Sequence, residues 1–245
     1  MSRRTQKGYA AVLCVWLVAL FLIASPPVIS DVDQNLDRSA RAAQLMDEEV
    51  LSYGWSLGGF KGMLARLVVP GRGGATLRTG RNGTGHLVSE LNIFSPRSRH
   101  GDFQRYGAEI GSGPAAETLK AWTTQMFRGR KKEKEEDLGG EGAVDIASSI
   151  WRLRREPAFG SGRSRLWSGG NFYPIEVRPA GKSWATLEGH RITTRSFLIQ
   201  GVRKEGARFW KGKVELVLAD NASSTPLEIV LRQEGVKVRL LLVQG

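Results

Sequence analysis

The segment VELVLADNASSTPLEIVLRQEGVKVRLLLV, residues 214–243, indicates the fold class most clearly. Apolar residues alternate with other residues in three stretches, Val214–Leu218, Leu227–Arg232 and Val236–Val243. Successive side chains of a strand point to opposite faces, so this period of two predicts three strands. The links between them, residues 220–226 and 233–235, consist of turn-forming residues, and Gly235 tolerates the positive φ of a tight hairpin. The segment therefore predicts an antiparallel meander.

The same alternation continues on the N-terminal side of this segment. Residues 53–57 read as a strand, residues 58–62 as a turn and Met63–Val69 as the returning strand of a hairpin. Further strands are expected within residues 76–79, 85–94, 102–110 and 117–128, and within the run from Arg163 to Val243. We therefore expect an all-β, mainly antiparallel domain over residues 50–245, built as a curved sheet or barrel-like structure.

One helix is expected in the middle of this domain, at residues 145–156. Asp145 can cap its start, and Pro157 would end it. Three arginines in its last turns, Arg152, Arg154 and Arg155, would oppose the helix dipole at the surface. The apolar face should pack inward and cover or plug the sheet through Ile150, Trp151 and Leu153.

The N-terminus predicts a membrane address. Residues 1–10 carry three basic residues and no acid, and residues 9–29 are apolar apart from Cys14 and hydroxyl side chains. A basic flank before an apolar run keeps the N-terminus cytoplasmic and exports the rest. Residues 1–30 therefore fit either an uncleaved transmembrane anchor or a cleaved signal peptide. Residues 31–49 read as a polar spacer, which could be helical.

The net charge of +12 arises from 36 Lys and Arg against 24 Asp and Glu. Most basic residues are scattered through strand positions, which is typical of a solvated surface. The densest run, residues 128–137, mixes both signs and favours a solvated hairpin rim. Its basic members are candidate contacts to an anionic membrane surface: Arg128, Arg130, Lys131 and Lys132. Nucleic acid is not an expected partner, because four acids follow these cations.

The residues give no sign of catalysis. His86, His100 and His190 lie far apart in sequence, and Cys14 lies outside the domain. We therefore predict no catalytic residue, no metal site and no cofactor. Trp167, Trp184 and Trp210 could line a cavity, although packing in the core is the simpler expectation.

Four motifs in this order resemble the bacterial envelope proteins of domain-of-unknown-function family 3108. They are Tyr53-Gly54-Trp55 with a glycine-rich hairpin, the helix segment 145–154, residues 171–177, and residues 218–220 with 225–229. The resemblance implies an exported, mostly antiparallel β protein with a barrel-like sheet, and no assigned activity.

Three functions are compatible with this sequence. The first is a non-catalytic envelope protein whose curved sheet holds a lipidic or other apolar ligand. The second is a structural or assembly partner of another envelope component. The third, a hydrolase of a cell-envelope polymer, lacks a pair of nucleophile and base. The domain would lie in the periplasm, anchored to the inner membrane or released if residues 1–30 are cleaved.

Overall fold

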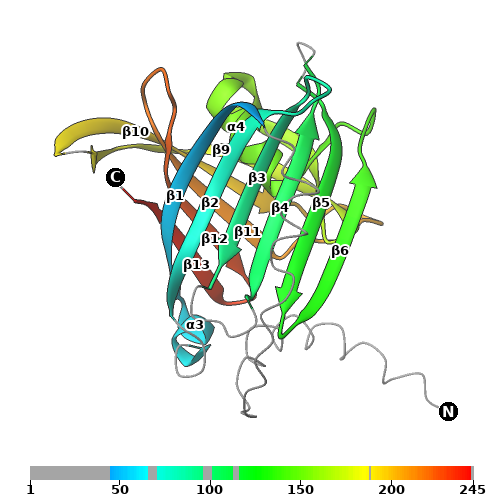
Figure 1. Ribbon diagram of the computed structural model, residues 1–245, viewed down its shortest axis with the longest axis horizontal. Coiled ribbons are helices and arrows are strands. Elements are labelled where there is room, and N and C mark those ends of the chain that lie inside the picture. Colours follow the sequence, from blue (N-terminus) through cyan, green and yellow to red (C-terminus); the bar gives the residue numbers. More distant parts are fainter. Residues whose placement is uncertain (1–44, 66–70, 96–100, 113–115, 188, 244–245) are drawn as a thin grey trace.

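The computed structural model describes residues 45–65, 71–95, 101–112, 116–187 and 189–243 (Figure 1). Thirteen strands form one sheet in the order β6-β5-β4-β3-β2-β1-β13-β12-β11-β10-β9-β8-β7. Their bounds are β1 Met46–Gly58, β2 Arg72–Arg81, β3 Leu87–Phe94, β4 Phe103–Ile110, β5 Thr118–Phe127, β6 Arg130–Asp137, β7 Ala143–Val144, β8 Gly162–Ser168, β9 Asn171–Leu187, β10 His190–Gly201, β11 Gly212–Ala219, β12 Pro226–Gln233 and β13 Val236–Leu242. Neighbouring strands are antiparallel, except that β7 and β8 are parallel. The mainly antiparallel, curved sheet predicted from the sequence is confirmed.

The C-terminal meander is present as predicted. β11 pairs with β12, and β12 pairs with β13. The link between β12 and β13 is a two-residue turn in which Glu234 and Gly235 both have positive φ, 50° and 89°. This is the backbone that a tight hairpin between right-twisted strands requires. β13 also pairs with β1, so the first and last strands of the domain are neighbours and join its two halves.

The prediction of a hairpin over residues 53–69 is wrong for the returning strand, residues 63–69. Residues 60–65 form a short helix, α3 (Phe60–Ala65), and the strand that returns along β1 is β2. Gly59 ends β1 with a φ of 79°, and the segment that follows carries no β-branched residue. Met, Leu and Ala favour helix over strand, which explains the outcome. Residues 66–69 lie outside the described ranges.

The central helix, α4 (Ile146–Arg155), begins and ends where the sequence predicts. The Asp145 carboxylate accepts hydrogen bonds from the backbone N–H groups of Ala147 and Ser148, at 3.2 and 2.7 Å. Ser148 Oγ in turn accepts from the Asp145 N–H, which completes a capping box. Ile150 and Leu153 are fully buried in the main core. Trp151 is only partly buried and packs against a smaller cluster with Ala108 and Ile110, so its expected place in the core is correct only in part.

The helix covers one end of the concave face of the sheet, next to β3 and β4 (Figure 1). Ser89 of β3 donates a hydrogen bond to the carbonyl of Ala147 at 3.3 Å. Arg154, which the sequence places at the surface, is instead buried and makes two hydrogen bonds to Glu49 of β1. The helix is therefore tied to both β1 and β3, and we refer to this as the α4 end of the sheet.

Of the other four tryptophans named above, three lie in the core and one does not. Trp55, Trp167 and Trp210 are each buried to within 8% exposure. Trp184 is 59% exposed, which contradicts the expectation of core packing. The reason is that β9 and β10 continue past the ends of their outer neighbours, where nothing is left to cover the side chain.

Candidate functional site

The concave face of β2–β6 is built from cross-strand rows of side chains. Residues that pair across an antiparallel sheet share a face, so the register defines each row. The row nearest α4 contains Ser89, Ala108 and Ala121 and is fully buried. The next row contains Leu91, Tyr106, Thr123 and Lys134, and the third contains Ile93, Gln104, Gln125 and Lys132. Leu91 belongs to the main core, which fixes this face as the inner one.

On β3 and β4, side chains become less buried from one row to the next as the distance from α4 increases. Leu91 is completely buried, but Tyr106 beside it and Ile93 in the third row are only partly buried. Gln104 and Gln125 are also partly buried. On β3, β4 and β5 the inner face therefore becomes accessible to solvent at the end of the sheet away from α4, which we call the open end. On β1, Trp55 and Leu57 stay buried at this same end.

The other half of the sheet supplies apolar groups to the same end. Leu231 of β12 and Val236 and Val238 of β13 pack against the core but stay partly exposed. Inward-facing side chains at the open end thus combine aliphatic and aromatic groups with amides on β4 and β5 and ammonium groups on β6. Small curved or closed sheets bind apolar ligands on such a face when their own side chains do not fill it.

The two ends of the sheet approach each other at the α4 end without pairing through the backbone. Ala121 of β5 packs with Leu138, Ala143 and Trp167 in a second buried cluster. Lys134 of β6 donates a hydrogen bond to the carbonyl of Gly169, in the β8–β9 turn, at 2.5 Å. The sheet is therefore drawn toward a barrel by side chains, and its edge strands stay separate in the sheet order.

Two tyrosines on the concave face are held in their neutral form. Burial raises the pKa of Tyr106 to about 12. Burial also raises the pKa of Tyr53, whose hydroxyl donates a hydrogen bond to the carbonyl of Pro226 at 2.9 Å. Neither hydroxyl is poised to give up a proton near neutral pH, so neither is a candidate nucleophile or base.

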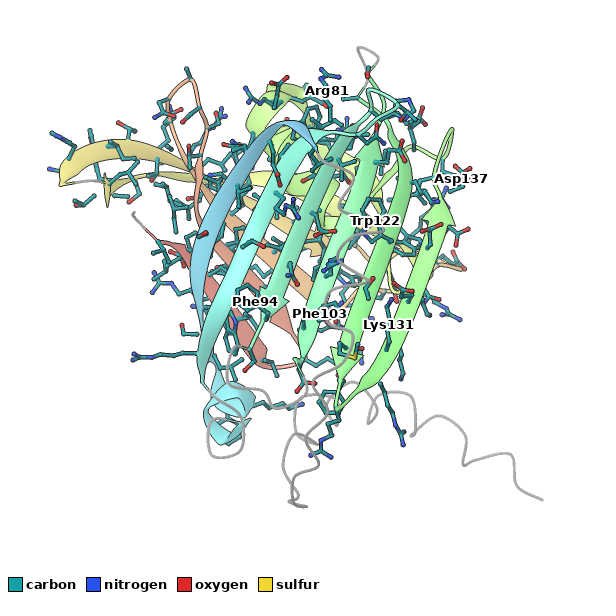
Figure 2. The ribbon with its side chains drawn as sticks, viewed as in Figure 1. Arg81, Phe94, Phe103, Trp122, Lys131 and Asp137 are labelled. Carbon is teal, nitrogen blue, oxygen red and sulfur yellow. The ribbon has the colours of Figure 1, made fainter. Side chains whose placement is uncertain are left out.

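The four cations singled out in the sequence do not form one patch. Arg128 lies in the β5–β6 turn, and its backbone N–H donates to Asp102 at 2.7 Å. The β6 register turns Arg130 and Lys132 toward the concave side and Lys131 toward the convex side, where Lys131 lies 3.3 Å from Glu133. Figure 2 labels Lys131 and, at the other end of the same strand, Asp137. Every residue of β6 is exposed, in line with a solvated rim.

His86 lies in a hydrogen-bonded cluster that looks like a catalytic triad and is not one. His86 Nδ1 lies 2.5 Å from Glu109 Oε1 and 3.4 Å from Thr84 Oγ1. A triad needs the acid on one ring nitrogen and the hydroxyl on the other, whereas here both contact the same nitrogen. Asn82 ties the cluster together by bonding to Thr84, His86 and Glu109. The cluster stabilises the β2–β3 turn.

A recess of about 270 Å³ lies beside the last turn of α4, between that helix and the start of β8. Arg152 lines it, donates two hydrogen bonds to Glu156 at 2.7 and 2.9 Å, and stacks over Phe159. The nearest opposite charge therefore already neutralises this arginine. Arg163 and Ser161 on the rim are exposed.

Within the described ranges, no three His, Cys, Asp or Glu side chains are grouped so that they could hold a metal ion. The helices of those same ranges are too short or too polar to cross a membrane. The predicted anchor or signal segment, residues 1–30, and His100 lie outside the described ranges.

Comparisons with known proteins add two structural likenesses. No protein-family model and no curated protein matches the chain. A β-barrel-like protein of Domain of Unknown Function DUF1849 from Brucella abortus is 10% identical over 83% of this chain and 98% of its own, with a TM-score of 0.45. A DUF1329 family protein from Desulfovibrio piger is 9% identical over 82% of this chain and 85% of its own, with a TM-score of 0.33. These findings do not support family 3108 in particular.

The residues of the open end were not identified from the sequence. Ile93, Gln104 and Gln125 lie on three different strands, and only the register brings them into one row. A signal was present in each strand taken alone, because Gln104 and Gln125 occupy positions where the alternation calls for an inward, apolar residue.

Proposed function

We propose that the protein is a non-catalytic, exported protein of the bacterial cell envelope that holds an apolar ligand, such as a lipid acyl chain, on its concave face at the open end. The observation that carries this proposal is the fall in burial along the inner rows. Leu91 is fully buried, and Ile93, two residues further along the same strand, is partly exposed.

The chemistry of the open end favours an elongated apolar ligand over a compact polar one. Ile93, Leu231 and Val238 present aliphatic surface that water now covers. Removing apolar surface from water is worth roughly 25 cal/mol per Å², so a chain lying across this face would gain affinity from contact alone. The flanking amides of Gln104 and Gln125 could orient a polar group at one end of such a ligand.

Export rests on the basic flank and apolar run of residues 1–30. Either form of this segment, anchor or cleaved signal, delivers the domain to the periplasm. Protease added to spheroplasts should digest the domain, and complete protection would refute export. A tethered domain also lies within reach of anionic headgroups. We expect its cations, including Arg128 and Arg130, to give a weak association that is lost near physiological salt.

A fluorescent fatty acid tests the ligand directly, with full-length protein purified in detergent. Ile93→Asn and Val238→Asn place an amide on the concave face, and Val50→Asn makes the same change on the exposed convex face. Probe binding should weaken in the first two variants and stay unchanged in the third. Equal binding by all four proteins, with folding confirmed by circular dichroism, would refute the concave site.

A specific observation also favours the second function, an assembly partner. Val50 of β1, Leu241 of β13 and Val243 lie on neighbouring positions of the convex face and are 50%, 42% and 55% exposed. An exposed apolar stripe is typical of a protein contact. Extraction from native membrane, followed by mass spectrometry of lipids and proteins, separates the two functions. Loss of a co-purified protein in Val50→Asn, with bound lipid absent throughout, would favour assembly.

A further inference from the structure

The β9–β10 hairpin extends well beyond the rest of the sheet. β9 pairs with β8 only as far as Val177, and β10 pairs with β11 only from Thr194 onward. Residues 178–183 of β9 therefore form a sheet edge beside a part of β10 that still pairs with β11. Only residues 184–187 and 190–193 pair with each other alone, and they correspond to about 13 Å of two-stranded ribbon at roughly 3.3 Å per residue. Figure 1 shows this ribbon, in yellow, projecting from the body of the sheet.

Packing does not explain the extension. Residues 178–184 are all exposed, so this part of the hairpin adds nothing to the core. A two-stranded ribbon without a third strand is only marginally stable in water. The hairpin also carries Trp184 at 59% exposure, in a protein whose other strand tryptophans are at least partly covered. An exposed indole at the end of a costly extension points to a contact outside the domain.

The residues around Trp184 define the chemistry of that contact. The register places Lys182, Trp184 and Arg191 on one face of the hairpin. The Arg191 guanidinium lies 4.6 Å from the centre of the indole ring, and Lys182 lies 3.0 Å from Asp220 at the base. Residues 178–195 contain four basic side chains and one acid, Glu188. Within the described ranges, neither Arg178 nor Arg191 takes part in an ion pair.

We propose that the tip of the β9–β10 hairpin docks on the headgroup layer of an anionic phospholipid bilayer. Tryptophan favours the membrane–water interface, where its ring is buried and its N–H stays hydrated. Leu187 and Ile192, next to the turn, can enter the same layer. Arg191, on the same face as Trp184, then faces the phosphates, where a basic residue near the surface contributes about 1 kcal/mol. Single-stranded nucleic acid fits less well, because it stacks successive bases on several aromatic rings, and the tip offers one.

The test uses the full-length chain in vesicles, with Cys14→Ser and Ser183→Cys carrying an environment-sensitive dye. The vesicles contain phosphatidylcholine alone, or a two-to-one mixture of phosphatidylcholine and phosphatidylglycerol. The dye should report an apolar environment only in the anionic vesicles, and high salt should reverse this. Arg191→Gln should lower the ratio of docked to free hairpin about fivefold, which corresponds to one charge at about 1 kcal/mol.

A matched control removes one charge just past the other end of β10. Arg203→Gln changes net charge equally and should alter the docked ratio less than twofold. Trp184→Ser should also abolish the dye response while the thermal midpoint stays the same. An equal response in neutral and anionic vesicles overturns the proposal, and so does an equal loss in the two charge variants. A response to oligonucleotide but not to anionic vesicles overturns it in favour of nucleic acid.

Discussion

Replacing Glu49 by Gln should destabilise the fold much more than replacing Glu228 by Gln. Each glutamate makes a bidentate contact with an arginine: Arg154 donates to Glu49 at 2.7 and 2.8 Å, and Arg239 donates to Glu228 at 2.6 and 2.9 Å. The environments differ. The Arg154 side chain is 2% exposed, whereas that of Arg239 is 44% exposed.

The magnitude follows from what Glu49→Gln leaves behind. Arg154 would stay buried with no anion; it would keep its contact to the Ser223 carbonyl at 3.4 Å and at most one hydrogen bond to the amide oxygen of the new side chain. Hydrogen bonds to charged groups contribute about 1.5–3 kcal/mol each. Glu49 is itself 39% exposed, so solvent screens part of the interaction. We therefore expect a loss of about 2–3 kcal/mol in the free energy of unfolding, against less than about 1 kcal/mol for Glu228→Gln.

Urea denaturation of four proteins measures this coupling: wild type, Glu49→Gln, Arg154→Met and the double variant. Arg154→Met removes the buried charge and lets Glu49 return to water, so the double variant should be more stable than Glu49→Gln alone. If Glu49→Gln and Glu228→Gln cost the same, Arg154 is solvated in solution and the reasoning fails.

The same comparison predicts a pH dependence. The hydrogen bonds from Arg154 lower the pKa of Glu49 from its ordinary value of 4.5. A lowered carboxyl pKa gives stability that is fully present above the ordinary value and is lost as the pH falls through the folded-state pKa. The stability difference between wild type and Glu49→Gln should therefore shrink below about pH 4.5. Burial raises the pKa of Asp145, but this carboxyl is common to both proteins and cancels in the difference.

Two further predictions concern packing. Leu153→Ala should cost about 2–5 kcal/mol because the side chain is fully buried, whereas Trp151→Ala should cost less than its size suggests because the ring is partly exposed; thermal and urea unfolding compare them, and the reverse order would place Trp151 in the core. Gly107→Ala should cost about 1–3 kcal/mol, since a Cβ there would lie 2.2 Å from the Trp122 ring that covers this glycine on the convex face (Figure 2). The loss should largely disappear in a Trp122→Ala background, and an equal loss in both backgrounds would show that the glycine is needed for another reason.

Features that depend on neighbouring residues could be predicted from the sequence. The β11–β13 meander follows from a period of two and a glycine-containing turn, both of which act within a few residues. α4 follows from the Asp145 cap and from Pro157, which are equally local. The short helix α3 was missed because a glycine-rich hairpin pattern and a helical turn look alike over six residues.

Features that depend on distant pairing could not be predicted. Glu49 and Arg154 are separated by 105 residues, and nothing near either one marks it as buried. The exposure of Trp184 depends on where β8 and β11 stop, which the sequence of β9 does not contain. The open end likewise exists only through the register of β3, β4 and β5.

β6 shows how one local pattern acquires a meaning from its neighbours. Its sequence, RKKEKEED, mixes both signs, but the register sends three cations and one acid, Glu136, to the concave side, and three acids and one cation, Lys131, to the convex side. Charges on an edge strand oppose pairing with another chain, which accounts for the sheet ending here. The same alternation places cations next to the partly exposed inner rows. The charges of this one strand therefore both protect the edge of the sheet and set the electrostatics of the proposed site. A variant that neutralises Lys132 would change both.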